Sequence, residues 1–589
     1  MFRKSLRTIR ILFRYAPGLT VIKLVQLGLT GVMAPLSIYF IQRVIDAASG
    51  VVAHGAGWKP LAVWCACLLG ALLFNSTEGG FLDGILGIAI KRRLNSGMTP
   101  NIVDKFKRLE YACFEDKDVQ DTLQRMSSDP QDKVFQLFLS VTGVLTCMMA
   151  MAGSALVFAQ VGWWFMAGFL VLLVPVVWLD FKAADMMNTM LNSQSTDERR
   201  MRDLGNLVAG KAALFELKLF GATEFIMGKW RGLAHQVLRT RVKTTFHAQR
   251  YYLVSLLLFK VWAAFIVLSL VAGALRGDMT IGLFTALIAS TGAVISNAEL
   301  LSHTLQRLRS RYLLMDHYYA FLALPEAVYG NRTLGDEPLT VEFEQVVFTY
   351  PKTSLPVLSG VSFTVSPGER VSLVGENGAG KSTIIKLLCR LYEPDSGRIL
   401  VNGIPIRELK RSELKRIFSV IFQDYQRYEL SLRENVAFGD LSSLENDEAL
   451  RAALRMGMAE ELAGNLDMPL GKLDPAGRDL SGGQWQRVAL ARACLPDSAF
   501  VILDEPAAAL DPLAESRMYE SFARVLANRG CILISHRLAS ARMADKIIVL
   551  ADGIVAESGN HRALMEAGGL YARMYESQRS WYGKEAVVS

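Results

Sequence analysis

The sequence predicts a multi-domain membrane protein: an all-α domain with six spanning helices, followed by an α/β domain with a phosphate-binding loop. Three observations support this fold class. The chain has 589 residues, which suits two or more domains. Hydrophobic residues make up 51% of it and charged residues only 20%, so it is more apolar than most soluble proteins. Nearly all of the long apolar runs precede Gln306, and the remainder has the composition of a soluble domain.

An apolar run of about 20 residues can cross a bilayer as a helix. Six runs meet this condition, and several are longer than a bilayer requires, so we expect these helices to continue beyond the membrane. The runs are Leu19–Asp46, Leu61–Ile90, Val134–Gln160, Val161–Asp180, Tyr251–Leu275 and Ile281–Leu305.

The links between these runs alternate in length. Three of them are short, namely Ala47–Pro60, a turn around Gly162, and Arg276–Thr280. The other two, Lys91–Lys133 and Phe181–Arg250, are long and charged. We expect the long links to form cytoplasmic turns between extended helices, within reach of the soluble domain.

The formal net charge is +8, and a basic protein can be a nucleic-acid binder. Here the basic residues gather at one set of span ends, while the short links carry only Lys59 and Arg276. This positive-inside distribution predicts a multi-pass protein of the cytoplasmic (inner) membrane with both termini and the soluble domain in the cytoplasm. We therefore expect the lipid bilayer, and no nucleic acid, as a partner. The basic residues are Arg3, Lys4, Arg7, Arg10, Arg14, Lys91, Arg92, Arg93, Lys105, Lys107, Arg108, Arg307, Arg309 and Arg311.

The N-terminal segment is basic and amphipathic. A signal peptide is the alternative interpretation, but the first apolar run is much longer than the apolar core of such a peptide. Apolar residues share one helical face of the segment and arginines share another, so we expect a short helix on the inner membrane surface that leads into the first span. The apolar face consists of Phe2, Leu6, Ile9 and Phe13.

The cysteines do not follow a metal-binding or redox pattern. The 7 cysteines form no CxxC pair and no Cys/His spacing typical of zinc. Cys65 and Cys67 lie in an apolar run, where cysteine behaves as a small hydrophobic residue. We expect neither a disulfide framework nor a cysteine-based metal site.

Polar residues inside the spans are candidate functional positions, because burying a charge in lipid is costly. Lys260 lies well inside the fifth run, and we expect it to face a polar cavity and to pair with a carboxylate of another helix. Asn297 and Glu299 lie late in the sixth run, and Glu78 lies late in the second. Both glutamates are near the inner interface, where they can also be in contact with water, so their role stays open.

The first motif of the soluble part is GENGAGKST, from Gly375 to Thr383. The apolar segment Val371–Val374 precedes it and a helical segment follows, which is the strand–loop–helix setting that a GxxxxGK[ST] loop requires. The glycines let backbone N–H groups close around phosphate oxygens. Lys381 would supply charge to the β- and γ-phosphates, and the Ser382 hydroxyl can be a ligand of Mg²⁺.

Two acids end a second predicted strand. Phe500–Leu503 leads into Asp504 and Glu505, at the strand end where open α/β sheets bind ligands. We expect Asp504 to hold Mg²⁺ indirectly and Glu505 to polarise the attacking water. A third strand, Cys531–Ile534, leads to His536, which can contact the γ-phosphate or be structural.

A second anion site is predicted between these strands. LSGGQWQRVALARA runs from Leu480 to Ala493 and is strongly helical after its two glycines. Ser481, Gly482 and Gly483 therefore form a helix start that suits a phosphate group. One nucleotide cannot easily use both anion sites of a single domain.

Together the motifs resemble those of the ATP-binding cassette (ABC) transporter superfamily. GENGAGKS resembles its Walker A motif, LSGGQ its signature motif and VILDE its Walker B motif. LSGGQ discriminates best, because many other NTPases share Walker A and Walker B. The six-span pattern resembles the exporter-type transmembrane domain, so the resemblance covers nearly the whole chain.

The resemblance implies ATP and Mg²⁺ as cofactors and a role for each matching residue. It implies catalytic roles for Glu505, for the switch histidine His536 and for the Q-loop residue Gln423. Metal ligands would be Ser382, Gln423 and Asp504. Nucleotide-binding residues would be Tyr350, which stacks on adenine, Gly375, Asn377, Gly378, Ala379, Gly380, Lys381, Ser382, Thr383, Ser481, Gly482, Gly483, Gln484 and the D-loop residue Asp511.

In that superfamily two nucleotide domains enclose two ATP molecules, each between the Walker A motif of one domain and the LSGGQ motif of the other. The resemblance thus explains the second anion site and requires a second nucleotide domain. Because Glu505 and His536 are both present, this half is catalytically complete. We expect a homodimer, with a heterodimer of related half-transporters as the alternative.

Two positions depart from the pattern of the superfamily. Within Asp474–Asp479, Pro475 stands where many exporters have a glutamate. We therefore expect cross-talk between the cytoplasmic turns and the opposite nucleotide domain to be built differently. In the D-loop, Ala508 replaces a common serine, with a small loss of hydrogen bonding.

The apolar runs and the motifs together suggest domain boundaries. We place the transmembrane domain at residues 1–323, a linker at 324–338 and the ATP-binding cassette at 339–589. Tyr111–Leu123 and Leu214–Glu224 resemble the cytoplasmic turns that exporters press against their nucleotide domains, with solvated charged helices as the alternative.

The motifs say less about the cargo than about the ATP site. The segment from Phe422 to Asn435 and the wording SGGQWQR resemble bacterial exporters of ribosomally made peptides such as lantibiotics. The first span begins near Leu19, which leaves no room for the N-terminal peptidase domain of some peptide exporters. We expect an ATP-hydrolysing exporter of a peptide or amphiphilic small molecule that works by alternating access. The alternatives are a multidrug exporter, a lipid or glycolipid flippase, an importer with an exporter-type fold, and a membrane ATPase without cargo.

Overall fold

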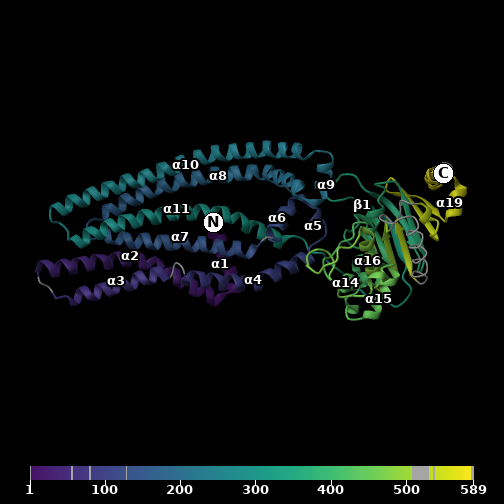
Figure 1. Ribbon diagram of the computed structural model, residues 1–589, viewed down its shortest axis with the longest axis horizontal. Coiled ribbons are helices and arrows are strands. Elements are labelled where there is room, and N and C mark those ends of the chain that lie inside the picture. The colour runs from purple at the N-terminus through teal and green to yellow at the C-terminus, as the bar shows by residue number, and fades with distance from the viewer. Residues whose placement is uncertain are drawn as a thin grey trace. The chain divides into compact units, whose positions relative to one another are not determined.

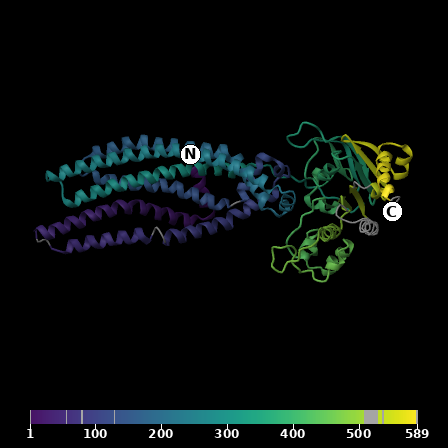
Figure 2. The ribbon, with the colours of Figure 1, turned by 45° about the horizontal axis from the view of Figure 1, so that its top comes forward.

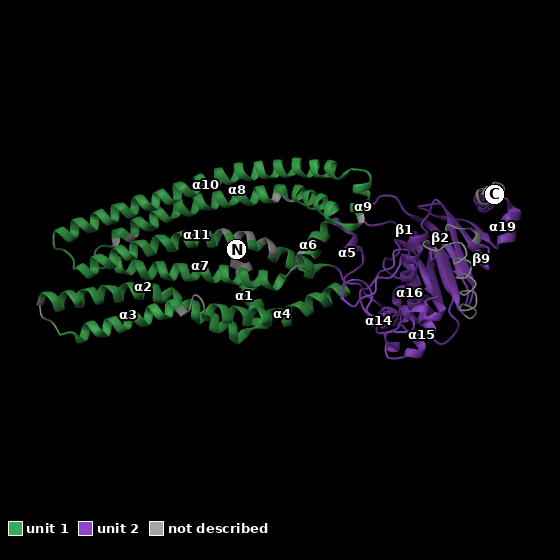
Figure 3. Ribbon diagram, in the orientation of Figure 1, with its two compact units in different colours: residues 1–108, 118–324 green, residues 109–117, 325–589 purple. Residues whose placement is uncertain are grey.

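The computed structural model describes residues 2–54, 57–77, 81–127, 129–506, 529–534 and 538–585. The chain divides into two compact units (Figure 3). Unit 1 comprises Met1–Arg108 and Asp118–Leu324, and unit 2 comprises Leu109–Lys117 and Pro325–Ser589. The predicted fold class is confirmed, because unit 1 is helical and unit 2 is an α/β domain.

Unit 1 consists of long helices packed side by side (Figures 1 and 2). Within the described residues, 6 helices contain a stretch that is long and apolar enough to cross a membrane, as predicted. The helices of the unit are α1 (Phe2–Tyr15), α2 (Pro17–His54), α3 (Lys59–Thr77), α4 (Asp83–Arg108), α6 (Lys117–Ser127), α7 (Pro130–Phe158), α8 (Trp163–Ala209), α9 (Lys211–Leu219), α10 (Thr223–Leu275) and α11 (Ile281–Ala323).

The longest helices exceed what a bilayer requires. α8 has 47 residues, α10 has 53 and α11 has 43. A helix of that length is roughly 65–80 Å long, whereas the hydrocarbon core is about 30 Å thick. The expected continuation beyond the membrane is therefore confirmed. α10 packs along α8, and α11 packs along α7, in both views (Figures 1 and 2).

Within the second predicted span, Leu61–Ile90, the described residues form α3 up to Thr77 and α4 from Asp83. Among the described residues of this run, Lys59–Ser76 is the stretch that is long and apolar enough to span. Glu78 lies outside the described residues.

The N-terminal segment is helical, as expected. Thr8, Ile11 and Leu12 of α1 are buried in unit 1, whereas Leu6 and Phe13 of the predicted apolar face are exposed. An exposed apolar face next to several arginines suits a helix at the membrane surface. That location stays a prediction.

Unit 2 contains two β-sheets. The strands are β1 (Val341–Phe348), β2 (Leu358–Val365), β3 (Arg370–Gly375), β4 (Ser396–Val401), β5 (Ile404–Pro405), β6 (Phe418–Ile421), β7 (Phe500–Asp504), β8 (Gly530–Ile534), β9 (Lys546–Ala551) and β10 (Ile554–Gly559). The smaller sheet is antiparallel, with the order β2-β1-β4-β5. The larger sheet has the order β10-β9-β3-β8-β7-β6, and all of its strands are parallel except β10.

The larger sheet positions the predicted motifs. Every residue of β7 and β8 is buried, which explains the uninterrupted apolar runs of their sequences. Because β3, β6, β7 and β8 are parallel, the residues that follow them lie at one edge of the sheet. The described helices of unit 2 are α5 (Ala112–Glu115), α12 (Lys381–Leu388), α13 (Arg411–Ile417), α14 (Leu432–Ala437), α15 (Asp447–Met456), α16 (Gly482–Cys494), α18 (Leu538–Ala541), α19 (His561–Ala567) and α20 (Leu570–Glu585), with short 3₁₀ turns at Ile406–Glu408, Leu441–Ser443 and Glu460–Leu462.

Candidate functional site

The GENGAGKST segment forms the loop between β3 and α12. Gly375 has a φ of +155°, and a Cβ at this position would collide with the carbonyl oxygen of Leu550. Gly380 has a φ of +99°, and a Cβ there would lie 2.5 Å from Leu358 Cδ2. Only glycine fits both requirements, so the two glycines let the loop turn tightly into the first turn of α12.

Lys381 begins α12 and lies under the loop. Its side chain is buried, and its Nζ donates to the carbonyl oxygens of Gly375 at 2.7 Å and Glu376 at 2.8 Å. Burial lowers the pKa of Lys381, while the Glu505 and Asp504 carboxylates counteract this shift. The ammonium group therefore lies where phosphate oxygens can replace the carbonyl oxygens as its acceptors.

Asp504 and Glu505 follow directly at the carboxyl end of β7. The pKa of Asp504 is raised to about 6, first by burial and then by the charge of Glu505, whereas Lys381 opposes the shift. Gln423, just after β6, donates from Nε2 to Glu505 Oε2 at 3.2 Å. Glu505 has a φ of +49°, a conformation that glutamate rarely adopts. The structure thus brings the lysine, both acids and the glutamine together.

The donor set of this edge fits Mg²⁺. The buried Asp504 carboxylate lies beside a second carboxylate, and Lys381 offsets this negative charge only in part, so a divalent cation would complete its neutralisation. Asp504, the Gln423 amide and the Ser382 hydroxyl offer the hard oxygen ligands that Mg²⁺ prefers. Ser382 and Gln423 are exposed, so both are accessible to a nucleotide–metal complex.

Tyr350 lies beside the loop, after β1. Its hydroxyl is 3.1 Å from Thr383 Oγ1, next to Ser382 in α12. Its ring packs edge to face against Phe348 and Tyr392, with centroids 5.0 Å and 5.4 Å away. Tyr350 is thus held next to the phosphate-binding loop, where a base can stack on it.

Ser481 is the N-cap of α16. Its Oγ accepts from the backbone N–H of Gln484 at 3.3 Å, and its own N–H donates to Gln484 Oε1 at 3.1 Å, which is a capping box. Ser481 and Gly482 are exposed, and a Cβ at Gly482 or Gly483 would meet nothing within 4 Å. The helix start is therefore open to a ligand from outside.

Comparisons with known proteins agree with this geometry. Residues 358–508 match the family model described as ABC transporter. The subtilin transport ATP-binding protein of Bacillus subtilis is 28% identical over 97% of this chain and 94% of its own length. The nisin transport ATP-binding protein of Lactococcus lactis subsp. lactis is 27% identical over 97% and 96%. The ATP-dependent lipid A-core flippase of Xylella fastidiosa (strain 9a5c) is 28% identical over 88% and 87%.

The chain belongs to the ABC transporter superfamily. A solved structure of a bacterial Atm1-family ABC exporter with ATP bound has the same fold, with a TM-score of 0.79 over 95% of this chain and 98% of that one at 22% identity. The protein is thus an ATP-hydrolysing, multi-pass membrane transporter with an exporter-type fold.

Part of the predicted ATPase machinery of the transporter cannot be placed. The switch histidine His536 and the D-loop residues Ala508 and Asp511 lie outside the described residues. The other site residues lie at the sheet edge, in the loop or at the start of α16, except Tyr350, which follows β1. In the atypical segment before the signature, Pro475 is exposed, and Asp474 Oδ1 accepts from the N–H of Ala476 at 2.8 Å.

In the membrane unit of the transporter, Lys260 is exposed on α10. Among the described residues of this chain no carboxylate forms an ion pair with it. Asn297 donates instead to its own helix, at Ala293 O, 2.8 Å away. The pairing predicted for Lys260 is therefore not present within the described chain, and its exposure to a cavity stays a prediction.

A polar cluster lies between α8, α10 and α11, and of its members only Glu299 stood out in the sequence. Asp180 is only 5% exposed and lies beside Ser302, Ser255, His303 and Glu299. The Ser302 and Ser255 hydroxyls lie within hydrogen-bonding range of the Asp180 carboxyl, but Asp180 Oδ1 and Glu299 Oε1 have no hydrogen-bond partner among the described residues. A buried carboxylate oxygen without a donor is costly in an apolar bundle, so this cluster is a candidate for binding a cationic group.

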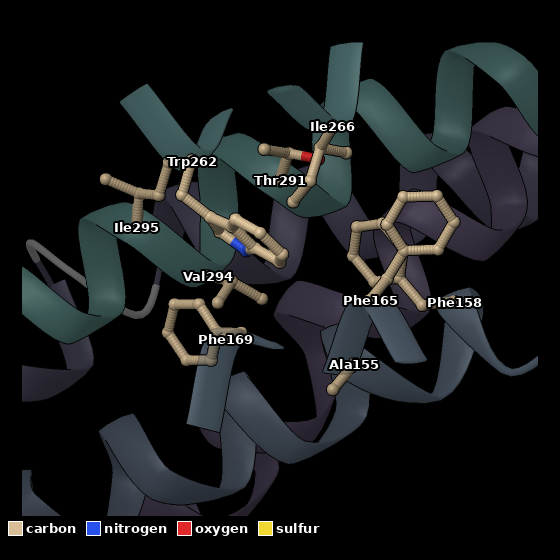
Figure 4. Close-up of a pocket in the computed structure, with 9 residues that line it drawn as sticks. All are labelled: Ala155, Phe158, Phe165, Phe169, Trp262, Ile266, Thr291, Val294 and Ile295. Carbon is tan, nitrogen blue, oxygen red and sulfur yellow. The ribbon is translucent and has the colours of Figure 1, made fainter. Parts of the chain in front are cut away.

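Unit 1 also has a small aromatic cavity (Figure 4). Its volume is about 20 Å³, room for no more than a water molecule, so it is not the cargo cavity. Trp262 points into it, and its Nε1 has no hydrogen-bond partner among the described residues. The lining residues are Ala155, Phe158, Phe165, Phe169, Trp262, Ile266, Thr291, Val294 and Ile295.

Proposed function

We propose that this ABC transporter is a homodimeric exporter of a peptide, driven by hydrolysis of ATP with Mg²⁺. The observation that carries the proposal is the likeness to two proteins of subtilin and nisin transport along 97% of the chain. The proposal includes an amphiphilic small molecule as the alternative cargo of the same exporter. The sites described above supply the chemistry.

The proposed hydrolysis uses residues at the carboxyl edge of the larger sheet. Lys381 and the loop N–H groups bind the β- and γ-phosphates, and Glu505 accepts a proton from the attacking water. Gln423 orients Glu505 through the 3.2 Å hydrogen bond. His536 contacts the γ-phosphate. Mg²⁺, when bound, would neutralise phosphate charge and would be held by Ser382, Gln423 and Asp504.

A second copy completes each ATP site in this proposal. The exposed start of α16 in one subunit binds the γ-phosphate held by Lys381 of the other. Around α9, an apolar face is also uncovered in the described chain, with Phe215 73% and Phe220 74% exposed. Such residues suit burial against the nucleotide domain of a second copy. We place both termini and the nucleotide domains in the cytoplasm, from the positive-inside distribution.

Transport in inside-out membrane vesicles tests the proposal. Vesicles that contain the protein should accumulate a labelled peptide when ATP and Mg²⁺ are present outside, and the Glu505→Gln variant should not. A small precursor peptide, if one is encoded beside this gene, is the first probe to label. If the vesicles hydrolyse ATP but move no peptide and no dye, the protein is instead a membrane ATPase without cargo.

A lipid or glycolipid flippase is the second candidate function. It is favoured by the likeness to a lipid A-core flippase over 88% of the chain. The same vesicles, loaded with a fluorescent lipid, separate the two functions, because a flippase moves the lipid between leaflets without any peptide. A dye as cargo would point to a multidrug exporter, and uptake in the opposite direction to an importer.

The buried acid of the membrane unit gives a prediction about the cargo. If Asp180 binds a cationic group, Asp180→Asn should raise the cargo concentration for half-maximal ATPase stimulation by about tenfold, since hydrogen bonds to charged groups contribute about 1.5–3 kcal/mol. Basal ATPase activity should stay the same. Asp203→Asn, which changes an exposed acid of the same helix, is the matched control. Equal stimulation in both variants would exclude this role.

A further inference from the structure

The short helix α5 belongs to the nucleotide-binding unit, although most of α4 and α6 on either side of it along the chain belongs to unit 1. Backbone contacts fix the segment. Glu110 N donates to Pro325 O at 3.2 Å, and Leu109 pairs with Glu326 in an isolated β-bridge. α5 is therefore held to the nucleotide-binding unit while it is continuous along the chain with α4 and α6.

Lys386 of α12 lies in an aromatic cage at the end of α5. Its Nζ is 5.0 Å from the ring centroid of Tyr350, 5.6 Å from that of Tyr392 and 5.9 Å from that of Tyr111. Glu115, the last residue of α5, closes the cage by accepting from Lys386 Nζ at 3.1 Å. Three rings and one carboxylate thus converge on a single ammonium group.

The cage favours the charged forms of both partners. Burial opposes a charge on Lys386, but the hydrogen bond with Glu115 and the electrostatic attraction of Glu115 and the neighbouring tyrosines together outweigh it, so the pKa of Lys386 is raised. Burial likewise opposes a charge on Glu115, but hydrogen bonds from Tyr392 and Lys386 keep its pKa low. The cation therefore persists next to the rings at neutral pH, where a cation–π interaction is attractive.

The same helix end also holds the loop that follows Tyr350. Asp116 accepts from Lys352 Nζ at 2.6 Å. Thr353 donates from its N–H and from its Oγ1 to Tyr350 O, at 3.1 Å and 2.7 Å, which closes the loop into a turn. The backbone and the ring of Tyr350 are thus both tied to the α5 segment.

We propose that Lys386 and Glu115 are positioning residues that hold the Tyr350 ring for an adenine base and so make ATP affinity depend on the position of α5. This inference rests on the proposed function, in which Tyr350 stacks on adenine. Lys386 lies over the Tyr350 ring, and in this proposal the base stacks on the face opposite Lys386. Because the two equilibria are linked, a bound base in turn favours the position of α5 in which Glu115 contacts Lys386. A shift of α5 away from that position weakens base binding by the same factor.

An ordinary surface ion pair is the simpler interpretation of Glu115 and Lys386. Such pairs contribute little, and their loss leaves ligand affinity unchanged. The contacts of Lys386 with three rings argue against it, because removal of the charge also removes one of the attractions that hold the Tyr350 ring. The two interpretations predict different ATP affinities.

Steady-state kinetics of the full-length transporter test the proposal. Lys386→Met should raise KM for ATP by about three- to tenfold with little change in kcat, as expected for loss of a partly buried cation–π contact. The inhibition constant of tripolyphosphate, which has phosphates but no base, should stay the same. Lys386→Arg should restore KM, since arginine keeps the charge over the ring. Arg398→Met, which breaks the Arg398–Glu344 ion pair of the smaller sheet, is the matched control.

A double-mutant cycle then shows whether Lys386 acts through Tyr350. In the Tyr350→Ala background, Lys386→Met should cause no further rise in KM, and Glu115→Gln should reproduce the effect of Lys386→Met in the unaltered background. An unchanged KM in Lys386→Met, additive effects in the cycle, or an equal loss of tripolyphosphate binding would overturn the proposal. Absence of ATPase activity in the unaltered protein would instead overturn the proposed function.

Discussion

Glu505→Gln should lower the rate of ATP hydrolysis by at least about a hundredfold, the size of effect expected for loss of a general base. An amide cannot accept the proton of the attacking water, yet it has nearly the same shape as the carboxylate. Gln423 donates to Glu505 Oε2 at 3.2 Å, and an amide oxygen can still accept this hydrogen bond. Binding of ATP should therefore persist in the variant while turnover stops.

The expected product is a trapped pair of subunits. Purified Glu505→Gln protein with ATP and Mg²⁺ should retain about two nucleotides per dimer after rapid gel filtration, as the two-site arrangement requires. Glu566→Gln, which changes an exposed glutamate paired with Arg562 on α19, should behave as the unaltered protein. Full turnover by Glu505→Gln, or nucleotide bound to single subunits only, would contradict the proposed role.

The parts of the fold that follow from short stretches of sequence could be predicted. The apolar run Val371–Val374 is a buried strand because both faces of the larger sheet are covered, and glycine at 375 and 380 is required by the local backbone. The same holds for Asp504 and Glu505, which directly follow the apolar run of β7. Local patterns therefore predicted the strand ends at which the candidate site lies.

The parts that depend on distant contacts could not be predicted. The resemblance placed the segment around Glu115 against a nucleotide domain, but it did not indicate Lys386 and Tyr392 as partners, because that contact joins segments separated by most of the transmembrane domain. Asp180 looked like the end of a span, and only the packing of α8 against α10 and α11 buries it. Asp424 was likewise missed, although its charge acts on Asp504.

An ion pair between two helices shows the same limit. Lys23 is fully buried and pairs with the partly exposed Asp83, and neither residue stood out in the sequence. Their pairing follows from the packing of α2 against α4 and not from spacing in the sequence. An acid and a base at matching depth in two predicted helices is the signal that could have found it.

Two inactive variants should restore activity when they are combined in one dimer. Lys381→Ala removes the ammonium that lies under the phosphate-binding loop, and Ser481→Arg blocks the exposed start of α16. Each homodimer then carries one defect in both ATP sites, so each should lose more than about nine-tenths of its ATPase activity, since such electrostatic contacts are worth about a hundredfold or more.

A mixed dimer distributes the same two defects differently. If each site consists of Lys381 from one subunit and Ser481 from its partner, both changes fall in one site and the other site stays intact. Dimers purified with two different affinity tags should therefore regain ATPase activity. The control is a mixed dimer that carries both changes in one subunit and none in the other. Like the two homodimers, it keeps no intact site, because Lys381→Ala damages one site and Ser481→Arg damages the other. Equal inactivity of the two mixed dimers would mean that cooperation between two intact sites is required, whereas activity of the control pair alone would show that each site is built within a single chain.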